Sequence, residues 1–125
     1  MKILLLEPGK VAREAEIDGS LESMQETVGG LITAVYLFSE PVAVVANDEG
    51  LLMGLPLNRK LDDYTIIAGT CFLCGLSDDS FADLPPELME KFKRQFYYPH
   101  LFLKVGDELV ALPCNPSKTE EGEQK

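Results

Sequence analysis

The pattern of apolar and polar residues opens with two short runs of strand type. Residues 2–7 are mainly apolar, the turn Pro8-Gly9-Lys10 follows, and residues 11–17 alternate in polarity. Two such runs joined by a turn are typical of a hairpin, and the alternation indicates that one face of the second strand is solvated. We therefore expect a first hairpin whose second strand lies near a sheet edge.

A short helical pattern follows this hairpin. Leu21, Met24 and Val28 recur at the spacing of one helix face, between Ser20 and the pair Gly29-Gly30. Serine is a favourable N-cap and glycine a favourable C-terminal residue, so the sequence predicts an amphipathic helix over residues 20–28.

A second and stronger helical pattern covers residues 84–97. Leu88, Phe92 and Phe96 recur at every fourth position and form one apolar stripe. Pro85 and Pro86 suit the first turn of a helix, and we expect Ser80 or Asp83 to act as its N-cap.

The remaining apolar runs predict strands. Residues 31–38 and 42–46 are β-branched and aromatic runs separated by three polar or turn residues, which predicts a second hairpin. Residues 64–75 are apolar on both faces, as expected of one central strand. Residues 101–105 and 108–112 flank a Gly-Asp turn and predict a last hairpin.

These elements predict one α+β domain spanning residues 1–114. Its sheet should be mostly antiparallel or mixed, with five to seven strands and two short helices, because each helix has a single apolar stripe to bury. The tail, residues 115–125, carries five charged and no large apolar side chains, so we expect it to be disordered. A chain of 125 residues buries roughly two thirds of its unfolded surface and needs no metal or disulfide for stability.

The charge of the chain disfavours several partners. With 21 acidic and 11 basic residues the net charge is −10, and no basic cluster is present to bind phosphates, so we expect no direct binding to nucleic acid. The apolar run at the N-terminus is shorter than a secretory signal, and no run approaches a membrane span. We therefore expect a cytoplasmic protein with no membrane partner, whose three cysteines are reduced.

Two candidate chemistries rest on cysteine and histidine. Cys71 and Cys74 have the spacing of a zinc knuckle, and His100 with Cys114 would complete a Cys3His set. In a strand, however, positions i and i+3 lie on opposite faces, so the two thiols should not share an ion. We expect no metal and no cofactor.

His100 is the sole histidine, so any Ser-His or Cys-His mechanism would require it. The sequence places no nucleophile or orienting acid beside it, and a histidine just before a strand is more often a partly buried packing residue. We predict no catalytic residue and favour a non-enzymatic protein, without excluding an enzyme.

The segment 47–59 is rich in glycine and polar residues between two apolar runs. One interpretation is a binding loop in which Asn47, Asn58 and Arg59 converge on an anionic or amide-bearing ligand. In this interpretation Arg59 donates a bidentate pair of hydrogen bonds to the ligand. The other is a structural crossing of the chain. The first predicts Arg59 at the surface, where truncation to alanine would affect binding more than stability. Its candidate binding residues are Asn47, Glu49, Gly50, Gly54, Pro56, Asn58 and Arg59, with Gly50 adopting positive φ.

Several motifs together resemble one known family. They are Glu7-Pro8-Gly9-Lys10, Glu16-Ile17-Asp18-Gly19-Ser20-Leu21, Val28-Gly29-Gly30, Asn47-Asp48-Glu49-Gly50, Gly54-Leu55-Pro56-Leu57-Asn58-Arg59 and Tyr64-Thr65-Ile66-Ile67-Ala68-Gly69-Thr70. With these motifs, residues 2 to about 113 resemble the DUF3846 family, an uncharacterised group of small bacterial and phage proteins. The resemblance implies a cytosolic α+β domain, often encoded on phages, plasmids and integrated elements, with no established activity. It also implies that Cys71 and Cys74 occupy ordinary apolar strand positions.

Two classes of function follow from this resemblance and the acidic charge. The favoured one is an accessory protein of a phage or mobile element that binds a host or element protein, for example as an acidic decoy of a nucleic-acid-binding surface. The alternative is a small-molecule binding protein or an enzyme that uses the 47–59 loop. The sequence predicts no oligomeric state.

Overall fold

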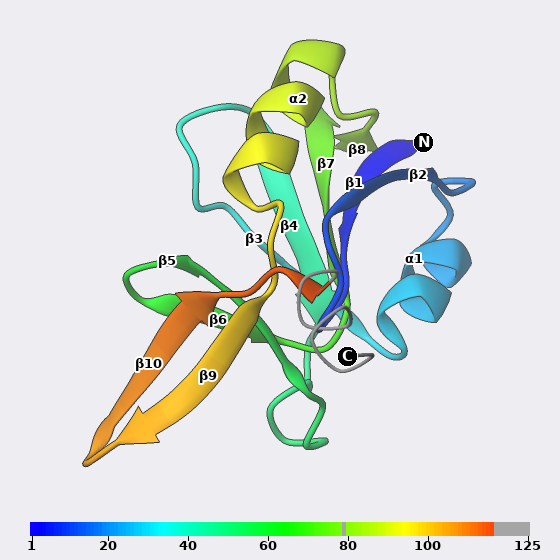
Figure 1. Ribbon diagram of the computed structural model, residues 1–125. Coiled ribbons are helices and arrows are strands. Elements are labelled where there is room, and N and C mark those ends of the chain that lie inside the picture. Colours follow the sequence, from blue (N-terminus) through cyan, green and yellow to red (C-terminus); the bar gives the residue numbers. More distant parts are fainter. Residues whose placement is uncertain (79, 117–125) are drawn as a thin grey trace.

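The computed structural model describes residues 1–78 and 80–116 (Figure 1). Within this part of the chain, ten strands form one six-stranded sheet and two separate two-stranded sheets, and every strand pair is antiparallel. The strands are β1 (Lys2–Leu6), β2 (Arg13–Glu16), β3 (Ile32–Val35), β4 (Val42–Asn47), β5 (Leu57–Asp62), β6 (Thr65–Ala68), β7 (Cys71–Ser77), β8 (Ser80–Ala82), β9 (His100–Val105) and β10 (Glu108–Pro113), and the helices are α1 (Leu21–Val28) and α2 (Pro86–Gln95). The predicted α+β class is confirmed.

The main sheet has the order β2-β1-β7-β4-β3, with β8 paired to β7. The predicted hairpins β1–β2 and β3–β4 are confirmed, and β2 lies at one edge of the sheet as expected. The other edge is β3.

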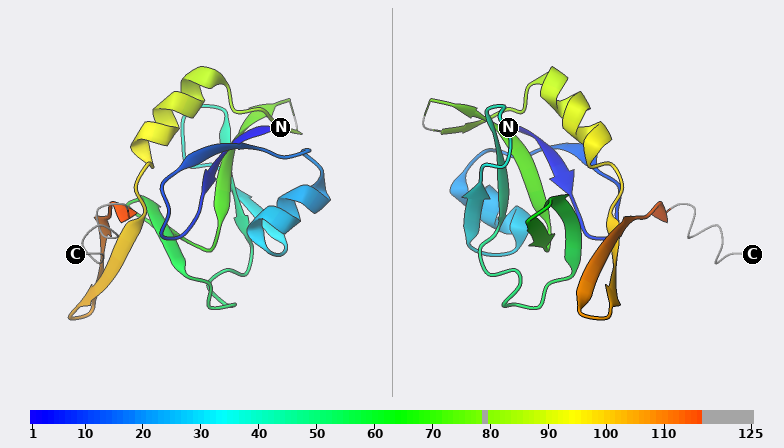
Figure 2. Two further views of the ribbon diagram at one scale, coloured as in Figure 1. Left: turned by 45° about the vertical axis from the view of Figure 1, so that its right-hand side comes forward. Right: turned by 90° about the vertical axis from the view of Figure 1, so that its left-hand side faces the viewer.

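Each face of this sheet is covered by one helix (Figure 2). The α2 face buries Leu4, Leu6, Val44 and Leu73 under Phe92. The opposite face has its own cluster, which consists of Ile3, Leu5, Met24, Val28, Ala43, Val45, Phe72 and Cys74. The single apolar stripe of each helix explains this arrangement, because one stripe buries one face. Neither helix of the described residues is long and apolar enough to cross a membrane.

The helix ends agree with the sequence in one case and differ in the other. Helix α1 begins after Ser20, whose hydroxyl accepts from the Ser23 N–H at 3.0 Å, and it ends at Gly29 in the left-handed conformation, as predicted. Helix α2 has Pro85 as its N-cap and no side-chain cap bond. The prediction of a Ser80 or Asp83 cap is wrong; the Asp83 carboxylate instead accepts from the Lys2 N–H at 2.8 Å and joins the helix entry to β1.

The segment 64–75 is two strands, not one. It turns at Gly69-Thr70, where the Gly69 N–H donates to the Pro56 carbonyl at 2.7 Å. Residues before this turn form β6 and pair with β5, while those after it form β7. The central position was predicted correctly for β7, which lies between β1 and β4.

The last predicted hairpin is confirmed as β9–β10, and it stands apart from the main sheet (Figure 1). Its strands extend away from the body of the molecule beside β5 and β6. Of the tail predicted to be disordered, 115–125, only Asn115 and Pro116 are described; residues 117–125 lie outside the described residues, and the prediction remains open.

Candidate functional site

Arg59, the centre of the predicted binding loop, is completely buried at 0% exposure. Its Nε donates to the Phe96 carbonyl at 2.8 Å, and its Nη1 donates to the Glu7 carbonyl and to Asn58 Oδ1 at 3.1 and 2.6 Å. Its Nη2 donates to the Lys10 and Tyr97 carbonyls at 2.6 and 3.2 Å. Since a guanidinium has five N–H groups, none remains for a ligand. The expectation that Arg59 lies near the surface is wrong.

Asn58 is buried to the same extent and completes this arrangement. Its Nδ2 donates to the Leu6 carbonyl at 2.8 Å and the Gly69 carbonyl at 2.9 Å, while its Oδ1 accepts from Arg59. Together, Asn58 and Arg59 link β5 to the end of β1, to the turn after it, to the β6–β7 turn and to the end of α2. We call these two residues and their carbonyl partners the cradle.

The positive charge in the cradle is balanced by backbone dipoles. Arg59 has no ion pair among the described residues, and four backbone carbonyls face it. Two of these carbonyls, of Phe96 and Tyr97, lie at the C-terminus of α2, the negative end of the helix dipole. Burial lowers the pKa of Arg59 to about 10, which still leaves it protonated near neutral pH.

The rest of the 47–59 segment consists of buried residues with structural roles and an exposed tip. Asn47 is buried, donates from Nδ2 to the Val28 carbonyl at 3.2 Å and accepts the Glu49 N–H at 2.8 Å. Gly50 does not adopt positive φ, contrary to the prediction; glycine is needed because a Cβ there would lie 2.6 Å from the Ala68 carbonyl oxygen. Gly54 has φ +71° and turns the chain. Glu49, Gly54 and Pro56 are exposed.

The predicted binding residues thus do not converge on one accessible point. Asn58 and Arg59 belong to the cradle, while Asn47 closes the loop onto α1. What the segment presents to solvent is an apolar tip, with Leu51, Leu52 and Met53 exposed by 70, 88 and 53%.

The two cysteines of the C-x-x-C motif lie in β7, as expected, and on opposite faces. Cys71 belongs to the cluster under α2, and Cys74 to the cluster under α1. Burial raises the pKa of each thiol to about 12, so neither is a thiolate near neutral pH. Among the described residues, no three His, Cys, Asp or Glu side chains are grouped to hold a metal ion.

His100 is the first residue of β9 and is partly buried, as predicted. Its Nδ1 accepts from the Lys60 N–H at 2.8 Å, which attaches the base of the hairpin to β5. Burial, together with the positive charges of Arg59 and Lys60, lowers the pKa of His100. The neutral ring is the form that can accept this bond. The role of His100 in this structure is attachment of the hairpin.

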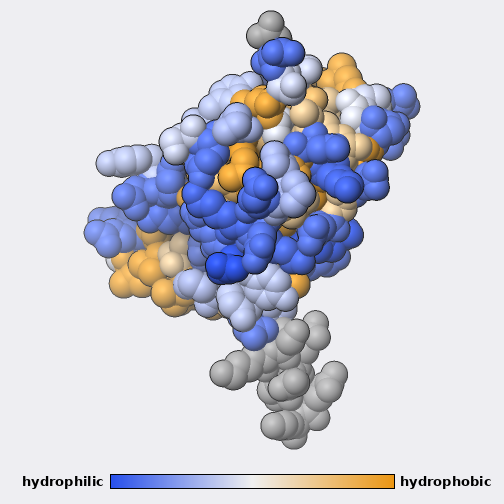
Figure 3. Space-filling model, turned by 90° about the horizontal axis from the view of Figure 1, so that it is seen from above, coloured by the Kyte–Doolittle hydropathy of each residue, from blue (hydrophilic) through white to orange (hydrophobic). Residues whose placement is uncertain are grey.

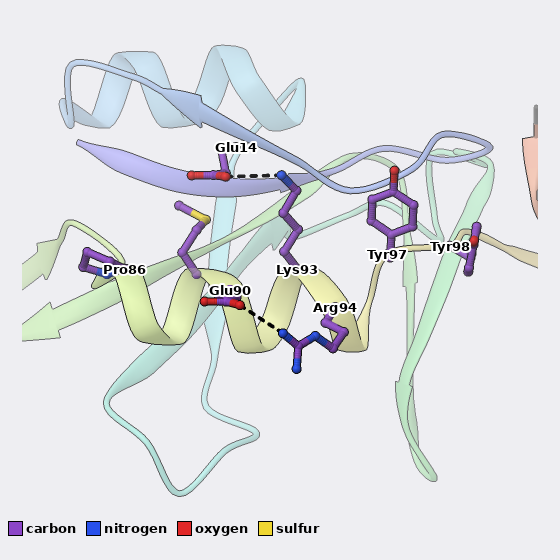
Figure 4. Close-up of a pocket in the computed structure, with 8 residues that line it drawn as sticks. Glu14, Pro86, Glu90, Lys93, Arg94, Tyr97 and Tyr98 are labelled. Atoms are coloured by element: carbon purple, nitrogen blue, oxygen red, sulfur yellow. Dashed lines mark hydrogen bonds and ion pairs between the residues drawn. The ribbon is translucent and has the colours of Figure 1, made fainter.

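A groove of about 690 Å³ lies between α2 and β2 (Figure 4). Its cations are already paired, Lys93 with Glu14 at 3.2 Å and Arg94 with Glu90 at 3.0 Å. Tyr97 and Tyr98, whose rings meet edge to face, line one end. The groove offers aromatic surface, and the partners of its cations leave no bare positive charge for an anion.

The β9–β10 hairpin carries an apolar face that no other part of the described chain covers. In the strand register, Leu101 is opposite Leu112, Leu103 is opposite Val110 and Val105 is opposite Glu108, so these six residues share one face. Leu101, Leu103, Val105 and Leu112 are exposed by 51, 43, 61 and 45%. We call the five apolar residues, Leu101, Leu103, Val105, Val110 and Leu112, the hairpin face.

The opposite side of the same hairpin is attached to the protein near its base. This side carries His100, Phe102, Lys104, Leu109 and Ala111. His100 and Phe102 form an edge-to-face ring contact, and β9 lies against β5. In the view from above, a hydrophobic area lies on the left, the side on which Figure 1 draws the β9–β10 and β5–β6 hairpins (Figure 3).

Sequence reasoning missed the hairpin face, although a signal for it was present. The strands of the last hairpin, LFLKV and ELVAL, place apolar residues at both odd and even positions, so both of their faces must be apolar. A two-stranded sheet that packs one face against the domain can leave its other face exposed.

Comparison with known families accounts for most of the chain. Residues 1–97 match the family described as a domain of unknown function, DUF3846. The chain belongs to this family. No curated protein matches the chain, and no solved structure does.

The match covers the main sheet but not the last hairpin. The main sheet, both helices and Arg59 lie within it, whereas the β9–β10 hairpin begins three residues after its last matched position. The resemblance expected to reach residue 113 therefore ends earlier. In this DUF3846 protein the exposed apolar face belongs to a segment beyond the matched domain.

Proposed function

We propose that this DUF3846 protein is a non-enzymatic cytoplasmic accessory protein, of a phage or other mobile element, that binds a host or element protein through the hairpin face. The observation that carries the proposal is the exposure of four apolar side chains on one side of a projecting hairpin. Apolar side chains scattered singly over a surface are ordinary, whereas these four lie together on one face. The saturated donors of Arg59 weigh against the alternative of a ligand held by the 47–59 loop.

The dimensions of the hairpin face favour a single helix as its occupant. Strands of six residues span about 20 Å, and two strands with their side chains are about 10 Å wide. A helix is also about 10 Å across, and about 13 residues of helix cover 20 Å. The resulting area of about 200 Å² is far below the roughly 800 Å² per partner of a stable interface between folded proteins.

The charge around the hairpin face favours a basic partner. Glu108 lies on this face and Asp107 in the adjoining turn, on a protein whose net charge is −10. An amphipathic helix with Lys or Arg beside its apolar stripe would match both the apolar strip and its acidic border. Residues 117–125 contain no apolar side chain and so do not supply the apolar stripe of such a helix.

Site-specific photo-crosslinking tests the proposal. A benzophenone amino acid at position 103 reports on the hairpin face, and the same group at position 109 is the matched control. Leu103 and Leu109 are leucines of similar exposure, 43 and 49%, on opposite faces of one hairpin. In the native host, crosslinks from position 103 should map to one basic, amphipathic helical segment of a protein. Equal crosslinking from both positions, or none from position 103, would contradict the proposal.

A further inference from the structure

The two edges of the main sheet differ in charge. The β2 edge carries Arg13, Glu14 and Glu16, and charged side chains protect an edge strand from pairing with other chains. The β3 edge has no such protection, because residues 31–36 include no charged side chain. In the strand order of the main sheet, β3 is the last strand on the side of β4.

The strand register shows which backbone groups this edge offers. The Leu31 carbonyl accepts from the Asp48 N–H at 2.8 Å, so the backbone groups of Leu31 point toward β4. Backbone direction alternates along a strand, and the N–H and C=O groups of Ile32 and Ala34 therefore point away from β4 to the open edge. Two exposed apolar side chains flank them, Leu31 at 60% and Tyr36 at 63%.

We propose that β3 pairs antiparallel with β3 of a second copy of this chain, joining two main sheets across a two-fold axis at Ala34. In this register Ile32 lies opposite Tyr36 of the partner subunit. Both are on the α1 side of the sheet, where Ile32 packs on the α1 cluster and Tyr36 borders a hollow with Met24. A β-branched residue opposite an aromatic one is a favourable cross-strand pair.

Pairing with a second copy is more favourable at the β3 edge than at the β2 edge. An antiparallel pair of identical strands is self-complementary, and pairing at β3 brings no charged side chain of residues 31–36 against another. The same pairing at β2 would bring Glu14 and Glu16 of two copies together. This inference uses a different surface from the hairpin face and does not depend on the proposed function.

Sedimentation equilibrium tests the pairing with three variants. The wild type should sediment as a dimer, with twice the chain mass of 13.8 kDa. The dimer fraction should rise with salt, because salt screens the repulsion between the two acidic copies. Ala34→Lys places two like charges opposite each other at the axis, and Ala34→Pro removes an N–H that β4 does not use. Both should be monomeric with cooperative thermal unfolding. Ala15→Lys, the matched change in β2, should remain dimeric.

A cysteine crosslink tests the register independently of those variants. With Cys114, which is partly exposed, changed to Ser, Ala34→Cys should form a disulfide-linked dimer on mild oxidation, whereas Ala15→Cys should not. A wild type that stays monomeric at its highest soluble concentration would overturn the proposal. So would a dimer that persists in Ala34→Lys and Ala34→Pro, or one that is lost on changing Leu103 instead.

Discussion

The cradle and the hairpin face reverse the usual distribution of polar and apolar groups. Arg59 and Asn58 are fully buried, while four leucine and valine side chains of the last hairpin are exposed. The cradle is stable because every donor of Arg59 has an acceptor; the hairpin face has no such partner in the described chain. The buried polar pair Asn58 and Arg59 is therefore structural, and the exposed apolar side chains of the last hairpin form the surface that we propose for binding.

On our proposal, the difference also separates the residues that stabilise the fold from those that bind a partner. The cradle joins β5 to the ends of β1 and α2, all inside the matched DUF3846 domain. The hairpin lies beyond that match and attaches to it mainly at its base. Changes in the cradle should consequently affect stability, and changes in the hairpin face should affect binding.

The largest effect is expected for Arg59→Met. This change leaves four backbone carbonyls and the Asn58 amide oxygen without their donor, and each buried unsatisfied group costs about 1–3 kcal/mol. We expect the free energy of unfolding, measured in urea, to fall by about 3 kcal/mol or more. Arg59→Lys keeps the charge but not the five donors. Its free energy of unfolding should therefore lie between those of the wild type and Arg59→Met. A loss below about 1 kcal/mol would show that the cradle is not architectural.

Asn58→Ala should have the next largest effect. It removes the donor to the Leu6 and Gly69 carbonyls and one acceptor of Arg59, while the guanidinium keeps its other four partners. We expect a loss of about 2 kcal/mol in the same urea experiment. If Arg59→Met and Asn58→Ala prove strictly additive in the double variant, the two residues do not act as one network.

Changes in the hairpin face should alter stability less than changes in the cradle. Leu103 is 43% exposed, and the part of its side chain that is buried contributes about 1 kcal/mol, so Leu103→Ser should lower the free energy of unfolding by about that amount. Leu109→Ser is the matched control on the opposite face. A loss of several kcal/mol for Leu103→Ser alone would mean that the hairpin face is covered within the monomer.

The smallest expected effect is a pH dependence from His100. Because burial and nearby positive charge lower its pKa in the folded state, the unfolded chain binds this proton first as the pH falls. The stabilising contribution of neutral His100 is present above about pH 6.5 and decreases as the pH falls from there toward the folded-state pKa. Urea unfolding at several pH values should show this slope in the wild type. A slope unchanged in His100→Gln would exclude His100 as its source.

The sequence predicted elements well and the environment of side chains poorly. Helix α1 was predictable because Ser20 and Gly29 define its ends locally. The burial of Arg59 was not, since its acceptors are carbonyls of Glu7, Lys10, Phe96 and Tyr97, which only the tertiary fold brings together. The break at Gly69 was hidden within a continuous apolar run. Which residues of the last hairpin remain uncovered depends equally on its packing against β5.

The most direct test compares how tightly two matched variants bind the helical partner segment. This segment is the one that crosslinking from position 103 identifies. Full burial of a leucine contributes about 1.5–3 kcal/mol, and a partner can bury only the 43% of Leu103 that is still exposed, so Leu103→Ser should weaken binding by about three- to ninefold. Leu109→Ser should leave the dissociation constant unchanged to within about twofold, since it lies on the other face. Equal weakening by the two variants would contradict the assignment of function to the hairpin face.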